Sequence, residues 1–170
     1  MDKVLSTVLL VIAAVVTAAM VINAVYPAVG ISVSALNSVS AKAADRVRSQ
    51  ASIIHAVGEL DQNGNWQDTN SNGTFDIFIW VKNTGTITID NMENGDVFLG
   101  SSGNWVRVPH EDYAGGTYPR WNYTVENGSE WMQAATLKIC LSYNGALPSG
   151  EYRIKIIIPN GIADEYIFSM

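Results

Sequence analysis

The sequence has few of the residues that build redox, metal or nucleic-acid sites. Cys140 is the only cysteine, so no disulfide can form within the chain. The histidines are His55 and His110 alone, so a zinc site would have to recruit carboxylates. Lysine and arginine together number 10 of 170 residues and form no run, which leaves no basic surface for a phosphate backbone. We therefore exclude nucleic-acid binding and expect Cys140 to pack as a small buried apolar residue.

Catalytic residue sets are also missing. No Ser–His–Asp or Cys–His arrangement is legible, and the chain has no nucleotide-binding loop. His110, Glu111 and Asp112 form a cluster that we expect in a solvated loop, and Glu126 and Glu130 fall in a turn region with no reason to act as an acid–base pair. The sequence therefore predicts a protein that is not an enzyme.

Apolar residues are concentrated at the N-terminus. Val4 to Ile22 contains no charged residue and, at 19 positions, is long enough to cross a bilayer as a helix. Small residues dominate the run, which lets helices approach closely, and Pro27 predicts a kink. A cleaved signal would have a shorter apolar core, which leaves a plain membrane anchor or a helix packed in a bundle of identical helices. The residues expected to mediate such packing are Val4, Leu9, Val11, Val15, Val16, Met20, Ile22 and Pro27.

The helical pattern continues beyond the uncharged run. Between Ser32 and Ile54, apolar residues recur at spacings of three and four, while charged residues occupy other positions. We therefore expect one helix of about 50 residues, roughly 75 Å long at 1.5 Å per residue. It should end near Ile54, with a first strand from about His55 to Leu60. Because one small domain cannot bury such a rod, something outside the chain must cover its apolar half.

The rest of the chain has the short alternating segments of a β protein, separated by turns rich in Gly, Asn, Asp and Pro. The pattern predicts an α+β chain, with the long hydrophobic helix over residues 1–54 and an antiparallel β-sandwich, immunoglobulin-like in architecture, as an outer domain over residues 55–170. The five tryptophans are expected in the core or an interface more than on a sugar-binding face. The other expected strands are 75–82, 86–89, 97–99, 104–108, 118–125, 136–141, 152–158 and 165–168.

A spacing typical of calcium loops precedes the first long strand. From Asp68 to Asp76, oxygen-bearing side chains recur at every second position around a glycine. The final glutamate of an EF-hand is missing, so the pattern predicts modest affinity suited to millimolar Ca²⁺, with a metal-free Asx-turn loop as the alternative. A weaker echo of the spacing runs from Asp61 to Asn65. The expected ligands are Asp68, Asn70, Asn72, Thr74 and Asp76.

Three N-x-[ST] sequons begin at Asn72, Asn122 and Asn127. Each can carry an N-linked glycan only if the chain is exported. We expect glycans on Asn122 and Asn127 first, because the side chain of Asn72 cannot readily serve both a glycan and a cation.

Four features together point to a family. They are the Ala/Val-rich opening Val4–Val25, the helix exit Arg48–Gly58 with its Ser/Ala/Val run ending in glycine, the stretch Trp80-Val81-Lys82-Asn83-Thr84-Gly85 followed by Ile89-Asp90, and a compact β domain with sequons. In these features the sequence resembles the archaellins and, more broadly, the archaeal type IV pilin-like proteins. The resemblance is close over residues 1–90 and architectural afterward.

The resemblance implies a membrane-inserted precursor that is cut by a prepilin-type peptidase and assembled into an extracellular filament with the N-terminal helices at its centre. Its partners would be copies of the same chain, the archaellum motor and platform that supply torque, and the surface layer. Three hypotheses stay open: a filament subunit for motility, an archaellum stator-like or adhesive pilus subunit, and a membrane-anchored, calcium-dependent binding module such as a lectin.

Overall fold

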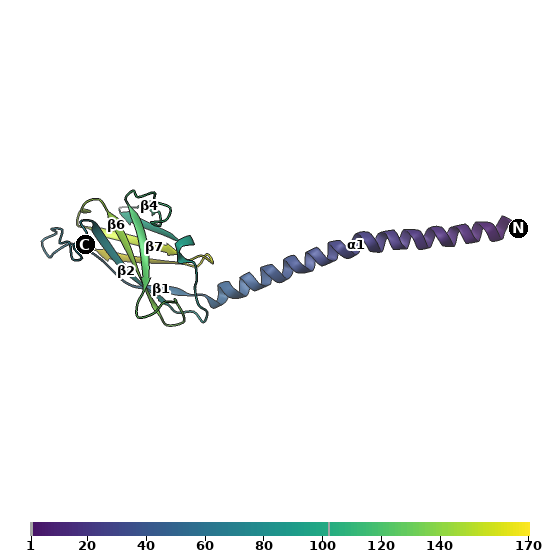
Figure 1. The fold of residues 1–170 in the computed structure, drawn as a ribbon, viewed down its shortest axis with the longest axis horizontal. Helices are drawn as coiled ribbons and strands as arrows, with labels where there is room; N and C mark the ends of the chain where they lie inside the picture. Colours follow the sequence, from purple (N-terminus) through teal and green to yellow (C-terminus); the bar gives the residue numbers. More distant parts are fainter. Residues whose placement is uncertain (1, 102) are drawn as a thin grey trace. The chain divides into compact units, whose positions relative to one another are not determined.

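The computed structural model describes residues 2–101 and 103–170 (Figure 1). The chain divides into two compact units, Met1–Ala43 and Ala44–Met170. The elements of the described residues are the helix α1 (Asp2–Arg48), the short 3₁₀ helix η1 (Met92–Asn94) and the strands β1 (Ala51–Gly58), β2 (Phe75–Asn83), β3 (Asp96–Ser101), β4 (Asn104–Val108), β5 (Arg120–Val125), β6 (Thr136–Tyr143), β7 (Glu151–Ile157) and β8 (Ala163–Ser169).

The helix α1 runs through Pro27 without a break in its assignment, but it ends earlier than the sequence predicts. It stops at Arg48, and β1 begins at Ala51. The predictions of a helix to Ile54 and of a first strand from His55 are therefore wrong. The division between the two units likewise falls after Ala43, because the last turn of α1 belongs to the unit that contains the sandwich.

Main-chain hydrogen bonds explain why the helix stops at this point. The turn after β2 presents three N–H groups to the chain that leaves α1. Thr84 and Gly85 donate to the carbonyl of Gln50 at 2.9 and 3.0 Å, and Thr86 donates to the carbonyl of Arg48 at 2.9 Å. Helical spacing of apolar residues continues past Arg48 in the sequence, but these donors give the backbone a better partner in the sandwich than another helical turn would.

The strands form two four-stranded antiparallel sheets, which confirms the predicted α+β chain with a β-sandwich. The strand order is β1-β2-β6-β5 in one sheet and β4-β3-β7-β8 in the other. The expected strand over residues 86–89 is wrong, since only Ile89 of that stretch forms a β-bridge, to Trp131, among the described residues. The backbone of this stretch is used elsewhere, by the helix exit and by the side chain of Asn83.

Alternating residues of both sheets fill the core. On β2, the side chains of Phe75, Ile77, Ile79 and Val81 are all buried, which follows from the period-two pattern of a strand that faces a second sheet. The five tryptophans divide between environments: Trp121 and Trp131 are buried, Trp80 is half-buried, and Trp66 and Trp105 are about 40% exposed. Cys140 is partly buried on β6, and burial raises the pKa of its thiol to about 12.

Candidate assembly helix and polar loop

The apolar side chains of α1 are exposed along its length. The large residues that sequence analysis assigned to helix packing are 47% to 69% exposed. Exposure continues past them, through Val25, Val29, Ile31 and Val33 to Val39, each at least 50% exposed. The predicted packing residues in this range are Val4, Leu9, Val11, Val15, Val16, Met20 and Ile22.

Apolar residues lie on every side of α1 between Val8 and Ile12, because these five consecutive positions are all large, apolar and exposed. A helix that is apolar all round is stable only inside a core or a membrane. By length and composition, the segment Lys3–Arg48 can cross a membrane.

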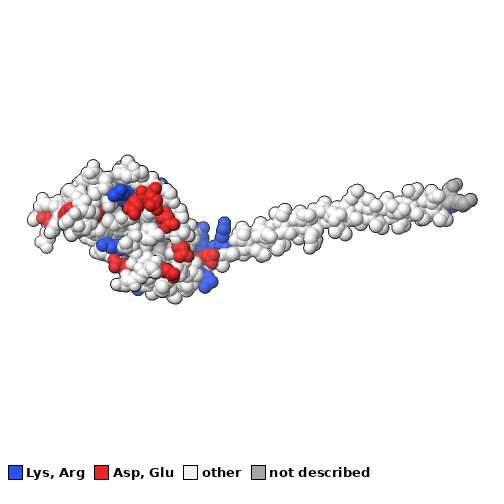
Figure 2. Space-filling view, viewed as in Figure 1, with Lys and Arg blue, Asp and Glu red and all other residues white. Residues whose placement is uncertain are grey.

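The distribution of charge along α1 also indicates burial in a core or a membrane. No charged residue occurs from Val4 to Ala41. Figure 2 shows acidic and basic side chains on the sandwich and at the C-terminal end of α1, while most of the helix surface carries neither. The helix therefore presents a long surface that favours apolar partners.

In the loop before β2, three of the five predicted calcium ligands converge on the carboxylate of a fourth. Asp76 is fully buried at the start of β2. Its Oδ2 accepts hydrogen bonds from the side-chain amides of Asn70 and Asn72, at 2.7 and 2.8 Å, and its Oδ1 accepts from the hydroxyl of Thr74 at 3.1 Å. These four residues therefore lie close together in the structure.

Asp68, the fifth predicted ligand, faces the loop backbone instead. Its Oδ2 accepts from the N–H of Gly73 at 2.9 Å, and its Oδ1 accepts from the N–H of Asn72 at 3.3 Å. The Gly73 amide, followed by other loop amides, lowers the pKa of the Asp68 carboxyl. Gly73 has φ +74°, the left-handed conformation that the sharp turn needs.

Sequence reasoning missed Glu59, which completes this network. It is buried, and its carboxylate accepts from the N–H of Asp76 at 3.1 Å and from both the N–H and the hydroxyl of Thr69. Neither Glu59 nor Asp76 has an ion pair with a lysine or arginine among the described residues. The available signal was an acidic residue directly after the strand β1.

The loop could bind a cation only if some of its side chains changed their orientation. The side-chain oxygens of Asn70 and Asn72 accept hydrogen bonds from loop N–H groups, so both amides would have to turn their oxygens toward a cation. No group of three His, Cys, Asp or Glu side chains within residues 2–101 and 103–170 is placed to hold a metal. The weaker echo of the spacing, from Asp61 to Asn65, forms a turn in which Asp61 accepts from the N–H groups of Asn63 and Asn65, both at 2.8 Å.

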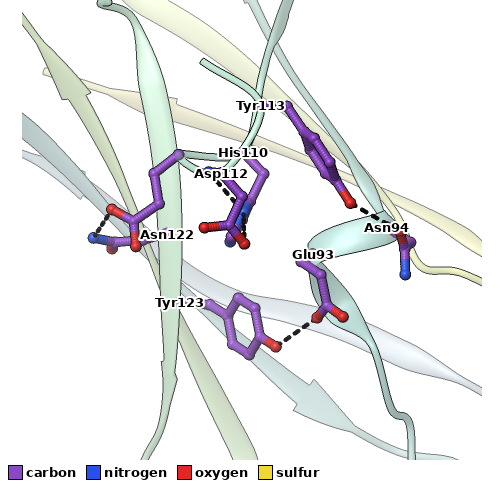
Figure 3. Close-up of polar contacts among 8 residues, drawn as sticks. Glu93, Asn94, His110, Asp112, Tyr113, Asn122 and Tyr123 are labelled. Carbon is purple, nitrogen blue, oxygen red and sulfur yellow. Dashed lines mark hydrogen bonds and ion pairs between the residues drawn. The ribbon is translucent and has the colours of Figure 1, made fainter. Parts of the chain in front are cut away.

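The three sequons differ in accessibility. Asn127 is exposed in the turn after β5. Asn122 lies within β5, is partly buried, and donates to the carboxylate of Glu111 at 3.3 Å (Figure 3). Asn72 is engaged with Asp76. The geometry therefore ranks Asn127 first as an acceptor.

His110 is buried, so the prediction of a solvated His110–Asp112 cluster is wrong for the histidine. Its ring packs edge-on against Trp121 at 4.6 Å between centroids, and its Nδ1 lies 3.4 Å from the carboxylate of Asp112. Next to it, the hydroxyl of Tyr123 donates to Glu93 at 2.9 Å (Figure 3). Burial, followed by Glu93, raises the pKa of Tyr123 to about 12. The hydrogen bond from Tyr123 to Glu93 connects β5 with η1, so we assign these residues a structural role in packing.

In a comparison with known protein families, residues 2–168 match the family described as archaeal-type flagellin. Curated protein sequences gave no match.

Two solved structures resemble the fold. The archaellum periplasmic stator protein FlaG from Sulfolobus acidocaldarius is 24% identical, with a TM-score of 0.53 over 71% of this chain and 99% of that one. A chain of the FlaF and FlaG stator complex from the same organism is 26% identical, with a TM-score of 0.51 over 70% of this chain and 88% of that one. None of these descriptions denotes an enzyme.

Proposed function

Since this chain belongs to the archaeal-type flagellin family, and is thus an archaellum-associated protein, we propose that it is a subunit of an extracellular archaellum filament. In this proposal, copies of α1 pack together at the filament centre and the sandwich forms the outer surface. The membrane holds the chain before assembly, the motor and platform of the archaellum supply torque, and the surface layer is a further partner.

The length of the exposed apolar helix carries the proposal. From Val4 to Val39 the helix measures about 54 Å at 1.5 Å per residue, whereas the hydrocarbon core of a bilayer is about 30 Å thick. Tilt reduces this excess only in part. A membrane therefore covers part of the apolar surface, and protein must cover the remainder. Other copies of the same helix, with their small residues, provide such a cover.

Microscopy of sheared surface material tests the proposal. Filaments released from cells by shear should contain this chain as their main component by mass spectrometry, and negative staining should show them to be uniform. The same spectra locate the mature N-terminus and the occupied sequons. If the chain stays in the membrane fraction while filaments lack it, the filament proposal is wrong.

That second outcome would favour a stator-like protein. The specific observation behind this alternative is the likeness of the sandwich to the FlaG chains, which are named as periplasmic stator proteins. A stator subunit needs the membrane span and the outer domain but no helix bundle. Cell fractionation therefore separates the two functions directly.

We also propose that the polar loop binds Ca²⁺ weakly, through Asp68, Asn70, Asn72, Thr74 and Asp76. Two buried carboxylates, those of Glu59 and Asp76, support this proposal, because neither has an ion pair with a lysine or arginine in the described part of the chain. Ca²⁺ at ten times its dissociation constant should stabilise residues 44–170 by about 1.4 kcal/mol, and D68N should abolish the gain. An unchanged melting temperature in millimolar Ca²⁺ would leave the loop as an Asx-turn structure.

We further propose that the outer surface of the sandwich carries N-linked glycans. Asn127 should be occupied before Asn122, because Asn127 is exposed in a turn. Peptide mapping of the sheared chain measures occupancy at each sequon. Full occupancy of Asn122 with an empty Asn127 would reverse this order.

A further inference from the structure

Asn23, in the middle of the apolar helix, has a main-chain carbonyl without its usual i+4 donor and a side-chain amide without a hydrogen-bond partner among the described residues. Pro27 has no N–H, so the carbonyl of Asn23, four residues earlier, lacks the donor that an interior helical carbonyl receives. The side-chain amide of Asn23 makes no hydrogen bond to the described residues. By contrast, the hydroxyls of Thr7 and Thr17, also in α1, bond to carbonyls one turn earlier.

Tyr26 lies three positions further on and is one of the most exposed residues of α1, at 80%. Its hydroxyl also makes no hydrogen bond to any described residue. Residues three apart share one side of a helix, so Asn23 and Tyr26 form a single polar spot.

An apolar depression of about 290 Å³ adjoins this spot, lined by Val21, Ile22, Val25, Tyr26 and Val29. Ile22, Val25, Tyr26 and Val29 have the spacing i, i+3, i+4, i+7, which is the four-residue hole that receives a side chain from a neighbouring helix. The polar spot therefore lies beside a surface shaped for helix packing.

Position along the helix argues against a membrane interface as the reason for these polar groups. Large apolar residues continue beyond Tyr26, with Val29 at 53%, Ile31 at 73% and Val33 at 50% exposure. Asn23 and Pro27 thus interrupt an apolar stretch instead of ending it. In a dry helix bundle an unpaired amide or carbonyl is costly, so these groups need partners from another chain.

We propose that Asn23 and Tyr26 form a hydrogen-bonded contact between neighbouring copies of the helix, in which the Tyr26 hydroxyl of one copy bonds to the polar groups of Asn23 in the next. The inference rests on the proposed filament. Copies related by a screw axis make contacts between different residues, and such contacts repeat along the whole filament. An Asn23–Tyr26 pair satisfies this condition, and it fixes the axial register of parallel helices, as a single buried polar residue does in coiled coils.

Cross-linking in assembled filaments tests the contact. Cells that lack the wild-type chain would co-express two full-length variants, N23C and Y26C, each also carrying C140S to remove the native thiol. Sheared filaments would be treated with a short bifunctional thiol reagent that spans the length of the tyrosine ring it replaces. We expect heterodimers of the two variants as the main product, and few dimers when either variant is expressed alone.

A second measurement does not depend on introduced cysteines. Y26F should lower the temperature at which filaments dissociate, while the matched outer-domain variant Y166F should leave it unchanged. P27A restores the N–H that Asn23 lacks, so Y26F on a P27A background should cause at most half of that shift.

The outcomes separate the two proposals. If wild-type filaments contain the chain but no heterodimers form and Y26F dissociates at the wild-type temperature, the Asn23–Tyr26 contact is wrong and the filament stands. If no filament contains the wild-type chain, the proposed function fails and the contact fails with it.

Discussion

The fully buried side chain of Asn83 connects three segments of the sandwich. Its Nδ2 donates to the carbonyls of Ile87 and Trp131, at 2.8 and 2.9 Å, and its Oδ1 accepts from the N–H of Gly85 at 3.0 Å. All the hydrogen-bonding groups of the amide are thus used. The asparagine of the archaellin-like stretch therefore has a structural role: it shapes the turn that holds the helix exit.

Asn83→Ala should destabilise the sandwich. The substitution removes all three hydrogen bonds of the amide. The N–H of Gly85 and the carbonyl of Trp131 keep their main-chain partners, Gln50 and Ile89, whereas the carbonyl of Ile87 loses the Asn83 donor. At about 1 kcal/mol for each lost hydrogen bond, we expect a loss of about 2–3 kcal/mol in the free energy of unfolding. Urea denaturation of residues 44–170, followed by tryptophan fluorescence, measures it. Asn144→Ala, in an exposed turn, is the matched control and should change stability by less than about 0.5 kcal/mol. Equal stability of the two variants would contradict the structural role.

Asp68 should titrate below the ordinary range of a carboxyl group. Hydrogen bonds from loop amides favour its charged form and lower its pKa. Its contribution to stability is therefore fully present above the unfolded-state pKa and is lost as pH falls through the lower folded-state pKa. The NMR shift of the Gly73 amide proton should report a titration midpoint below the ordinary carboxyl value, and D68N should abolish this titration. A midpoint at or above the ordinary carboxyl value would contradict the hydrogen bonds seen in the loop.

At the scale of elements, the contact between the helix exit and the turn after β2 depends on Gly85. A Cβ added there would lie 2.5 Å from the carbonyl oxygen of Arg48 and 2.6 Å from the nitrogen of Gln50. Both are backbone atoms, so no side-chain rotation relieves the clash. Only glycine permits this approach of two main chains.

Gly85→Ala should therefore separate the helix exit from the turn. We expect a loss of about 2–4 kcal/mol in the free energy of unfolding of residues 44–170, and faster amide hydrogen exchange at Thr84 and Thr86, whose donors would lose their acceptors. Gly128→Ala is the control, because its Cβ would have no neighbour closer than 3.8 Å. Unchanged exchange at Thr86 in the Gly85 variant would show that the approach is looser than the structure indicates.

Local patterns predicted most elements but not their ends. Alternation identified β2 and β6, and the uncharged apolar run identified α1. The end of α1 depends on donors from residues 84–86, more than thirty positions away, which no local window contains. The polar loop was predictable because its residues are adjacent in sequence. Its link to Glu59 and the fully buried state of Asp76 arise only when β1 pairs with β2.

At the scale of the whole molecule, the two units differ in the solvent exposure of their apolar residues. The sandwich has its own buried apolar core and carries most of the charge, so we expect it to fold in water without the N-terminal unit. The N-terminal unit exposes nearly every apolar residue it has. The proposed assembly through α1 would remove the apolar helix from water without burying the charged surface of the sandwich.

Removing residues 1–43 should therefore give a soluble, folded monomer that does not assemble. A chain that begins at Ala44 keeps Arg48 and Gln50, whose carbonyls accept from the turn after β2. A chain that begins at Ser52 loses these acceptors, and it should be less stable by about 2–4 kcal/mol, at about 1 kcal/mol for each lost hydrogen bond. Light scattering and urea denaturation of the two truncations measure both effects. Filaments formed by the Ala44 chain would show that the sandwich drives assembly, and equal stability of the two truncations would show that the helix exit contributes nothing to the fold.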